Sequence, residues 1–439
     1  MLSHRALMFP RYDWRVDLRR GLRRAVLVIA VLEPAATPAH AQSAGGARER
    51  TPISLTTARD AALRQAPDVT LARGRHEIAR TQVDVAGALT NPAVTVTTAR
   101  ETARLGAGVS LPAPLFGQRA TAVSAASADA DAAGLEVDAV RQDARWNATL
   151  AWLDLWEAEE RARLLAAAAS EAERVATIAD EKFKAGSAPR VEVLRTAADR
   201  ERARADAAFA AASVPAAAAR LTVAIGGTGV DGREWTAAGK PDLALADTDL
   251  AALQRGVADH PILRWDRARI AAGAAHVRAE QRARWPIVTG DLTVNWHDPT
   301  LPATDVIAGI SLEAPVLSLR RGAIARAQAE QRLAQATAEL EQRRLSASLV
   351  DALGRASGAG ERARTLANSV LPALEEAWRM YEEGYRDGRI DLLRLLDAQR
   401  ARLDTRIAVV EAEAAWQRAL ADVERASGVS LASVGGRGP

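Results

Sequence analysis

Histidine and carboxylate side chains are the residues of this sequence that could bind a metal ion or transfer protons. Six histidines occur among its 439 residues. His4 and His40 lie near the N-terminus, and the other four are scattered along the chain: His76, His260, His276 and His297. None belongs to an H-E-x-x-H or comparable pairing, so the sequence predicts no metal site.

Two other patterns could suggest chemistry, and both have simpler explanations. GGTG at Gly226–Gly229 lacks the preceding strand and the following Gly-Lys-Ser/Thr of a phosphate-binding loop, so we predict a turn where a helix ends. Glu157, Glu160, Arg161 and Arg163 recur at helical spacing, which is typical of a solvated helix face. No nucleophile stands beside a base, and a hydrolase would need a cleft. We therefore predict neither an enzyme nor a cofactor.

The elements that carry these residues form a duplicated chain. GVSLPAPLF at Gly108–Phe116 matches GISLEAPVL at Gly309–Leu317. FKAGSAPRVEVLR at Phe183–Arg195 similarly matches YRDGRIDLLRLLD at Tyr385–Asp397. Two matches at nearly one offset predict two similar halves of about 200 residues each.

Composition favours long helices over a thick core. Aromatic residues make up 4% of the chain, and alanine supplies much of the apolar content. Ala, Arg, Glu, Leu and Gln lose little on entering a helix. The absence of cysteine excludes disulfides and thiolate metal sites.

The first 41 residues have the pattern of an export signal. Basic residues precede the apolar run Ala25–Leu32, and Ala39-His40-Ala41 forms a small-x-small cleavage site. This segment holds seven of the 58 basic and three of the 55 acidic residues, so the remainder has a formal net charge of −1. Basicity therefore gives no support for nucleic-acid binding.

Each half is predicted to contain a first helix, a β-hairpin, a long helix, a turn and a last helix. We place the signal peptide at 1–41, the first repeat at 42–230, a linker at 231–249, the second repeat at 250–428 and a tail at 429–439. The first helices span Thr56–Leu89 and Leu250–Arg284, and the last span Arg190–Ile225 and Ile390–Ser427, with a kink at Pro215. The long helices span Gln118–Phe183 and Leu319–Tyr385, with a kink at Pro372. No stretch has the ~18 apolar residues of a membrane helix.

The predicted strands alternate between apolar and other residues, which places apolar side chains on one face. The strands of the first half are 92–100 and 105–112, and those of the second are 287–296 and 306–312. The shared-face residues are Val94, Val96, Leu105, Ala107, Val109 and Leu111 in the first half, and Val306, Ala308, Ile310 and Leu312 in the second. We predict that the last four face lipid.

Four strands cannot close a membrane barrel, and an open edge leaves backbone groups unsatisfied in lipid. Three copies would supply twelve strands, which is within the range of outer-membrane barrels. We therefore predict a mainly α fold with a small β part, in which long helices form a coiled-coil barrel and four strands per chain contribute to a barrel shared by several chains.

The sequence resembles the TolC family of outer-membrane efflux proteins over nearly all of its mature length. The resemblance is carried by GVSLPAPLFGQR, GISLEAPVLSLRRG, VLPALEEAW and YRDGRIDLLRLLDAQR. It implies a homotrimer with a twelve-stranded barrel in the outer membrane of a Gram-negative bacterium, with lipid around the barrel and a helical tunnel in the periplasm. It further implies a passive duct that receives substrate from an inner-membrane pump through a periplasmic adaptor.

The resemblance also implies that two helical turns form the periplasmic tips, which contact the adaptor and constrict the entrance. Their residues would be Phe183, Gly186, Glu192 and Leu194 at the first turn, and Tyr385, Gly388, Arg394 and Asp397 at the second. The family often has acidic residues just beyond the second turn, where this chain has Arg394 before Asp397. We expect Glu192 and Arg394 to form ion pairs that hold the entrance closed.

The substrate is indicated by one short match. Gly117-Gln118-Arg119 is similar to the Gly-Lys/Gln-Arg of the branch that serves cobalt, zinc, cadmium or copper pumps. Heavy-metal cations are favoured, with drugs as the alternative. A periplasmic or surface coiled-coil scaffold without a pore is the alternative function, although a scaffold has no use for four strands with one apolar face.

Overall fold

The computed structural model describes residues 50–98, 105–227, 234–244, 250–296 and 304–431, which belong to one structural unit. The predicted signal peptide and most of the predicted tail lie outside these residues. In the first repeat the elements are β1 (Arg50–Ile53), α1 (Leu55–Gln65), α2 (Pro67–Gly87), β2 (Ala93–Thr97), β3 (Leu105–Ala113), α3 (Gln118–Lys184) and α4 (Arg190–Ala224). The following elements are β4 (Glu234–Ala237), α5 (Leu250–Ala258), α6 (Pro261–Arg282), β5 (Ile287–Trp296), β6 (Asp305–Glu313), α7 (Arg321–Thr365), the π-helical turn η1 (Leu366–Val370), α8 (Leu371–Arg386) and α9 (Leu392–Ser427).

The first helix of each half is broken into two, where the sequence predicts one continuous helix. Pro67 begins α2 and Pro261 begins α6. Proline suits the first helical position because it needs no amide hydrogen there, and it disfavours a helical conformation in the residue before it. The two proline positions therefore explain both breaks.

The first long helix forms close to its predicted bounds. The second begins at Arg321 and not at Leu319, because Leu319 and Arg320 have positive φ, and a π-helical turn precedes Pro372. Helix α3 spans 67 residues, and α7 continues through η1 into α8. The π-helical turn ends two residues before Pro372, a position where it can accommodate the missing amide donor and the bulk of the ring. Helix α4 similarly continues through Pro215.

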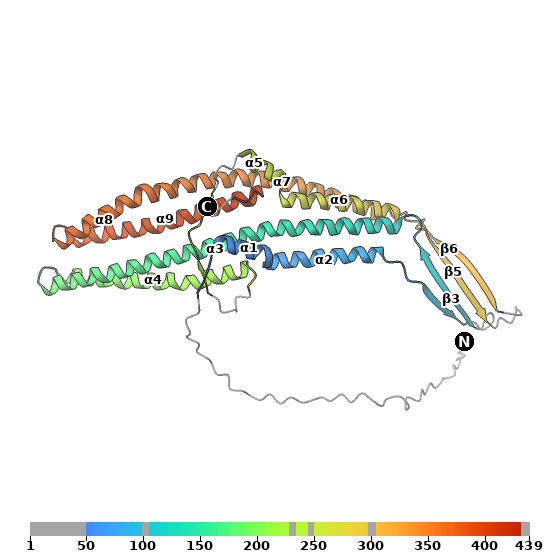
Figure 1. Cartoon of the computed structure of the whole chain (residues 1–439), viewed down its shortest axis with the longest axis horizontal. Coiled ribbons are helices and arrows are strands. Elements are labelled where there is room, and N and C mark those ends of the chain that lie inside the picture. Colours follow the sequence, from blue (N-terminus) through green and yellow to red (C-terminus); the bar gives the residue numbers. More distant parts are fainter. Residues whose placement is uncertain (1–49, 99–104, 228–233, 245–249, 297–303, 432–439) are drawn as a thin grey trace, which may run out of the picture. The chain divides into compact units, whose positions relative to one another are not determined.

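The helices lie side by side, with the four-stranded sheet at one end and the α3–α4 and α8–α9 turns at the other (Figure 1). Near the sheet, α3 packs between α2 and α6, and α6 packs on α7. Towards the turns, α3 packs between α4 and α9, and α9 packs on α8. The first repeat thus supplies one side of this arrangement, and the second repeat supplies the other.

The main core lies where the two repeats meet midway along α3. Trp152, Leu153 and Leu155 of α3 are fully buried among side chains of α1, α4, α7 and α9. The Trp152 indole N–H donates a hydrogen bond to the carbonyl of Ile53 at 2.8 Å, which fixes β1 against this core. Strand β1 pairs in parallel with β4, so part of the predicted linker 231–249 is a strand.

One helix differs from the prediction that no stretch is apolar enough to cross a membrane. By length and composition α4 contains an 18-residue window with a mean hydropathy of 1.4 and no more than two charged residues. Alanine produces this value, and Ala210, Ala217 and Ala218 are buried. Helix α4 packs along α3, where small side chains allow close approach.

Candidate membrane sheet and periplasmic tips

The strands pair in the order β2-β3-β5-β6, and all pairs are antiparallel. Residues directly opposite each other in such pairs share a face. One face therefore carries Val94, Val96, Leu105, Ala107, Val109, Leu111, Ala113, Val288, Gly290, Leu292, Val294, Trp296, Val306, Ala308, Ile310 and Leu312. The register places all ten predicted shared-face residues together.

The opposite face of the sheet is mostly polar or glycine. Ser311 donates a hydrogen bond to the Asp291 carboxylate at 3.0 Å on this face. Gly106 lies so close to its neighbours that a Cβ there would be 2.6 Å from the Thr97 hydroxyl and 2.8 Å from the Asn295 side chain. Side chains converge on the polar face, so any larger residue at Gly106 would force the Thr97 or Asn295 side chain to shift.

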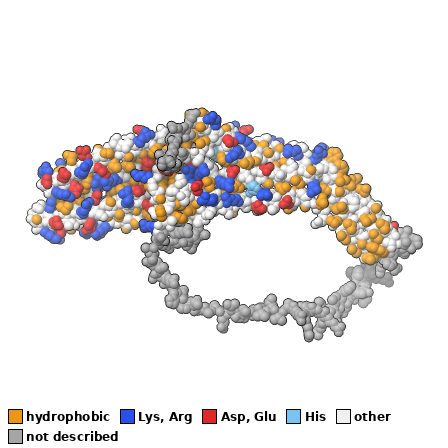
Figure 2. Space-filling model, viewed as in Figure 1, with side chains coloured by type: hydrophobic (Ala, Val, Ile, Leu, Met, Phe, Trp, Pro, Cys, Tyr) orange, Lys and Arg blue, Asp and Glu red, His pale blue; other side chains and the backbone are white. Residues whose placement is uncertain are grey.

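The apolar face of the sheet is open to solvent in the single chain. Val94, Val96, Ile310 and Leu312 are exposed, and hydrophobic side chains cover the strand end of the molecule in Figure 2. Charged side chains instead lie over the helices. A continuous apolar face on an otherwise polar sheet has the pattern of a membrane barrel wall.

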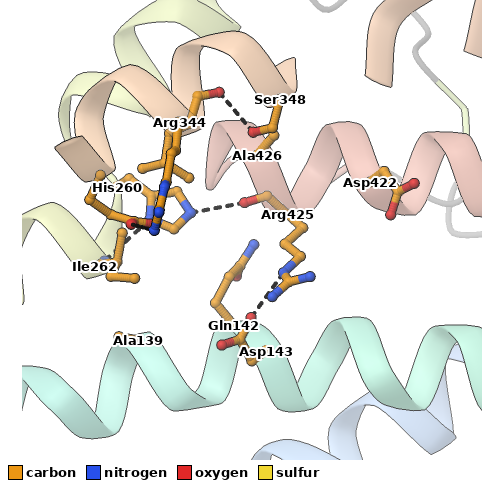
Figure 3. A pocket seen from close by; sticks show the side chains of 12 residues that line it. Ala139, Gln142, Asp143, His260, Ile262, Arg344, Ser348, Asp422, Arg425 and Ala426 are labelled. Carbon is orange, nitrogen blue, oxygen red and sulfur yellow. Dashed lines mark hydrogen bonds and ion pairs between the residues drawn. The ribbon is translucent and has the colours of Figure 1, made fainter. Parts of the chain in front are cut away.

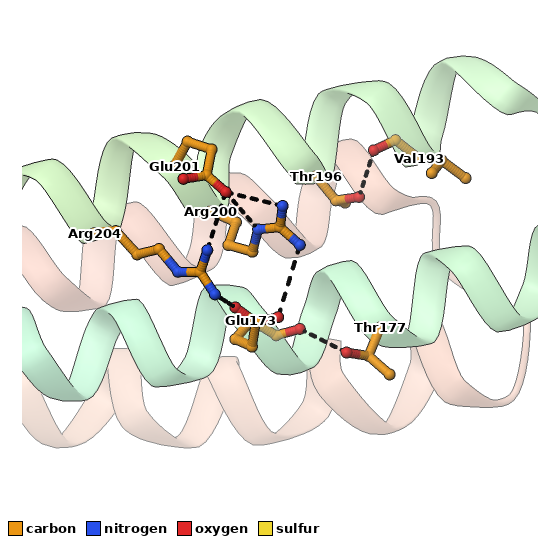
Figure 4. Close-up of polar contacts among 7 residues, drawn as sticks. All are labelled: Glu173, Thr177, Val193, Thr196, Arg200, Glu201 and Arg204. Atoms are coloured by element: carbon orange, nitrogen blue, oxygen red, sulfur yellow. Dashed lines mark hydrogen bonds and ion pairs between the residues drawn. The ribbon is translucent and has the colours of Figure 1, made fainter.

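The first tip turn follows the end of α3. Gly186 has φ = 76°, its amide bonds to the carbonyl of Phe183 at 2.9 Å, and the Ser187 amide bonds to that of Lys182 at 2.9 Å. These two bonds satisfy the last carbonyls of α3 and require the left-handed conformation that glycine adopts readily. An ion-pair network fastens α4 to α3 beyond the turn, since Glu173 contacts both Arg200 and Arg204 (Figure 4).

The second tip turn repeats this geometry at the end of α8. Gly388 has φ = 73° and bonds to the carbonyl of Tyr385 at 3.2 Å. Asp391 then begins α9, because its carboxylate accepts the Arg394 amide hydrogen at 3.0 Å. The matched aromatic-x-x-Gly motifs therefore form equivalent turns.

The two turns differ in what covers their apolar residues. Tyr385 and Leu396 are each 4% exposed, in a second core with Val175 of α3. Phe183 and Leu194 occupy the matching positions of the first turn and are 41% and 61% exposed. The first turn therefore presents an apolar surface that the single chain leaves open.

Lys182 connects the two turns, and sequence reasoning missed it. Its ammonium group donates a hydrogen bond to the carbonyl of Tyr385 at 2.7 Å and lies 3.8 Å from the centre of the tyrosine ring. A basic residue in the last turn of a helix usually serves the carbonyls of its own helix. The contact between Lys182 and Tyr385 of the other hairpin could therefore not be predicted from the sequence.

The buried Tyr385 side chain is held in its neutral form. Burial raises the pKa of its hydroxyl, and the Glu192 carboxylate of α4 adds to this effect. Within the described residues the hydroxyl finds no hydrogen-bond partner. The charge of Glu192 is therefore felt by the second hairpin of its own chain.

The remaining predicted tip residues are exposed at the start of α9. Arg394 lies 3.5 Å from the Asp391 carboxylate in the same helical turn, so within the chain it pairs with Asp391 and not with Glu192. Asp397 is also exposed. The structure places Arg394 and Asp397 on the surface, and Glu192 makes no hydrogen bond to the Tyr385 hydroxyl.

A cavity of about 210 Å³ lies between α3, α6, α7 and α9 beside His260, one of the scattered histidines (Figure 3). The Ile262 amide donates to His260 Nδ1 at 3.2 Å, so Nε2 carries the proton and donates to the Arg425 carbonyl at 2.8 Å. Burial lowers the pKa of this histidine. His260 therefore begins α6 and ties it to the end of α9.

The structure contains no group of three or more metal-ligating side chains within the residues that it describes. His297 lies outside them. Gly226 ends α4 with φ = 88°, as the prediction of a turn requires.

These features define a channel wall: a membrane sheet with one apolar face, continued by long helices. Residues 58–227 and 252–429 match the model of the outer membrane efflux protein family, once in each repeat, and the chain belongs to this family. It is an outer-membrane efflux channel with a helical extension in the periplasm, so the poreless scaffold is excluded.

Individual relatives agree with this assignment. The chain is 26% identical over 301 residues to the cobalt-zinc-cadmium resistance protein CzcC of Cupriavidus metallidurans, covering 69% of this chain and 71% of that protein. Its fold is similar to a membrane protein from Pseudomonas aeruginosa, with a TM-score of 0.72, 20% identity and coverage of 85% of this chain and 93% of the other. It is also similar to CusC, with a TM-score of 0.71, 16% identity and coverage of 85% and 91%.

Proposed function

We propose that three copies of the chain close a twelve-stranded barrel and a continuous helical tunnel. The observation that carries this proposal is the sheet with one wholly apolar face and two open edges. Among the described strands β2 and β6 each pair on one side only. Their free backbone groups need partners in lipid, and twelve strands are within the size range of such barrels.

The helices beside the open strands support the same closure. Helix α2 exposes Leu71, Ile78 and Val85 at seven-residue spacing, and α7 exposes Leu333 and Leu340 at the same spacing. An apolar seven-residue repeat is the pattern of a coiled-coil seam. These edges lie on opposite sides of the chain, so α7 of one copy can pack against α2 of the next.

The tips form the periplasmic entrance and the contact with the adaptor that delivers substrate from an inner-membrane pump. The exposed Phe183 and Leu194 provide an apolar surface for such a partner, and Gly186 and Gly388 shape the turns. Glu192 and Arg394 of neighbouring hairpins bias the entrance towards closure. The pump supplies the energy for transport.

The substrate is a heavy-metal cation that passes through the duct. The similarity to CzcC supports this class. The Gly117-Gln118-Arg119 match has a structural role as well, because Gly117 has φ = 83° before α3 and Arg119 bonds to the Gly87 carbonyl at 2.7 Å.

A deletion strain tests this function. Without the protein we expect more accumulated cobalt, zinc and cadmium, with drug accumulation unchanged, and the purified protein should conduct ions across a planar bilayer. The negative control for conductance is Ile310→Arg, because a charge on the lipid face should prevent the barrel from assembling. Accumulation of drugs in place of metals would contradict the substrate assignment, and absence of conductance by the purified protein would contradict the duct.

A further inference from the structure

The junction between strand and helix is closed in the first repeat by residues of the second. Phe116 follows β3 and stacks on Trp285 before β5, with ring centres 5.6 Å apart and an angle of 27° between the rings. The Gln118 side-chain amide donates to the carbonyls of Trp285 at 3.3 Å and Pro286 at 3.1 Å. The first repeat is thus fastened to the second at the membrane end of the helices.

The corresponding junction after β6 has an apolar residue in the open. Leu317 is 100% exposed. Leu319 and Arg320 follow it with φ values of 44° and 52°, which are strained for residues other than glycine. Arg320 is held by two hydrogen bonds to Glu280, at 3.0 and 2.7 Å. A fixed and strained backbone therefore presents Leu317 to the surroundings.

The internal duplication gives Leu317 a partner. Val109 and Ile310 occupy the same place in the repeated motif, and they pair with Val94 and Gly290 in their own hairpins. Val94 and Gly290 are therefore equivalent positions. Counting five residues back from each gives Leu89 and Trp285, and Leu317 corresponds to Phe116.

The counterpart of the Phe116–Trp285 stack is then a contact between Leu317 and Leu89. Leu89 is 74% exposed. The two leucines adjoin β6 and β2, which are the opposite edges of the sheet, so they cannot meet as neighbours within one chain. Both are apolar, and burial of such side chains against each other is favourable.

We propose that Leu317 of one copy packs against Leu89 of the next copy, in the place that Phe116 and Trp285 occupy within the chain. The same equivalence sets the strand register between copies. Leu111 lies opposite Gly290 within the chain. Leu312 is equivalent to Leu111, and Val94 is equivalent to Gly290, so Leu312 should lie opposite Val94 of the next copy. One residue along each strand, Ser311 should then lie opposite Thr95 of the next copy. This inference rests on the proposed trimer and specifies how its subunits meet.

The chain has no cysteine, so introduced cysteines report these contacts without background. The full-length variant Leu89→Cys/Leu317→Cys, oxidised in isolated outer membranes, should give disulfide-linked trimers on non-reducing gels. Thr95→Cys/Ser311→Cys should give the same product, because directly opposite Cβ atoms lie about 4.5–5.5 Å apart. Phe116→Cys/Trp285→Cys is the positive control for the junction geometry and should link within one chain.

The register has its own control. Thr97→Cys/Ser311→Cys displaces one cysteine by two residues on the same face and should link at least tenfold less than Thr95→Cys/Ser311→Cys. Native mass spectrometry of each variant separates the two claims. Two results would overturn this inference alone while the protein remains a trimer. One is more disulfide in Thr97→Cys/Ser311→Cys than in Thr95→Cys/Ser311→Cys. The other is rapid reaction of Leu317→Cys with a lipid-soluble thiol reagent. A monomer would overturn the proposed trimer as well.

Discussion

At the scale of residues, equivalent positions of the two repeats have different surroundings. The motifs predicted both tip turns, including the glycines at positive φ. The motifs could not predict that Leu396 is buried and Leu194 is exposed. Side chains of α3 such as Val175 pack on Leu396, and no element of the described chain packs on Leu194 in the same way. Burial here depends on which neighbour the fold brings, and Lys182 was missed for the same reason.

Leu396→Ala should destabilise the second tip, whereas Leu194→Ala should not. Removing a buried leucine side chain costs about 2–5 kcal/mol, and exposed substitutions usually stay within about 0.5 kcal/mol. Amide hydrogen exchange of residues 385–396 measures the local effect. Equal protection in both variants would contradict the assigned burial.

His260 should make stability depend on pH. Burial is the main influence on its pKa and lowers it. The hydrogen bond to the Arg425 carbonyl and the charges of Asp143 and Glu341 favour the protonated ring, whereas the positive charge of the Arg425 side chain disfavours it. The stability that comes from the neutral ring is fully present above the unfolded pKa of about 6.5 and is lost as pH falls through the lower folded pKa.

The test compares the wild type with His260→Asn, since asparagine can still accept the amide hydrogen at the start of α6. Thermal unfolding followed by circular dichroism between pH 7.5 and 5.5 should show a loss of stability in the wild type that is smaller in the variant. A variant that loses as much stability over this range would show that His260 is not responsible.

At the scale of elements, the alternation of apolar residues predicted all four strands of the large sheet to within a few residues. The break between α1 and α2 could have been predicted from Pro67. Strand β4 could not, because its four residues carry little pattern and its partner β1 lies far away in the sequence. The sequence also could not predict the pairing between β3 and β5, which joins the two repeats.

The two faces of β6 should respond differently to charge. Ile310→Arg places a charge on the apolar face, at a cost of about 2–4 kcal/mol near mid-bilayer. Ser311→Arg lies on the polar face beside Asp291, which can pair with it. We expect the first variant to lower the yield of assembled protein in outer membranes far more than the second, and similar yields would contradict the assignment of faces.

At the scale of the whole molecule, both edges of the chain are incomplete. The sequence predicted this from the number of strands alone, and the structure adds exposed apolar residues along α2 and α7 on the same two edges. Which residues meet across the edges cannot be read from one chain, because the contacts belong to the assembly. The duplication supplies the missing geometry.

In the proposed trimer six helical hairpins form the entrance, and this entrance should respond to the sign of charge at Arg394. In the chain Arg394 pairs with Asp391, and exposed ion pairs contribute about 0–1 kcal/mol each. Arg394→Glu should raise single-channel conductance by placing like charges together, and adding Glu192→Arg should restore the closed state. Unchanged conductance in the single variant, or no restoration in the double one, would show that this ion pair does not hold the entrance closed.

The mass of the native assembly directly tests whether several chains share one barrel. The full-length protein, extracted from outer membranes in mild detergent and measured by native mass spectrometry, should appear as a particle of three chains. The described four-stranded sheet leaves one free edge on each side, so other copies are needed to close the barrel, and the resemblance to the TolC family implies three copies in all. A stable particle of one chain would show that the open edges of β2 and β6 need no partner, and would contradict the shared barrel.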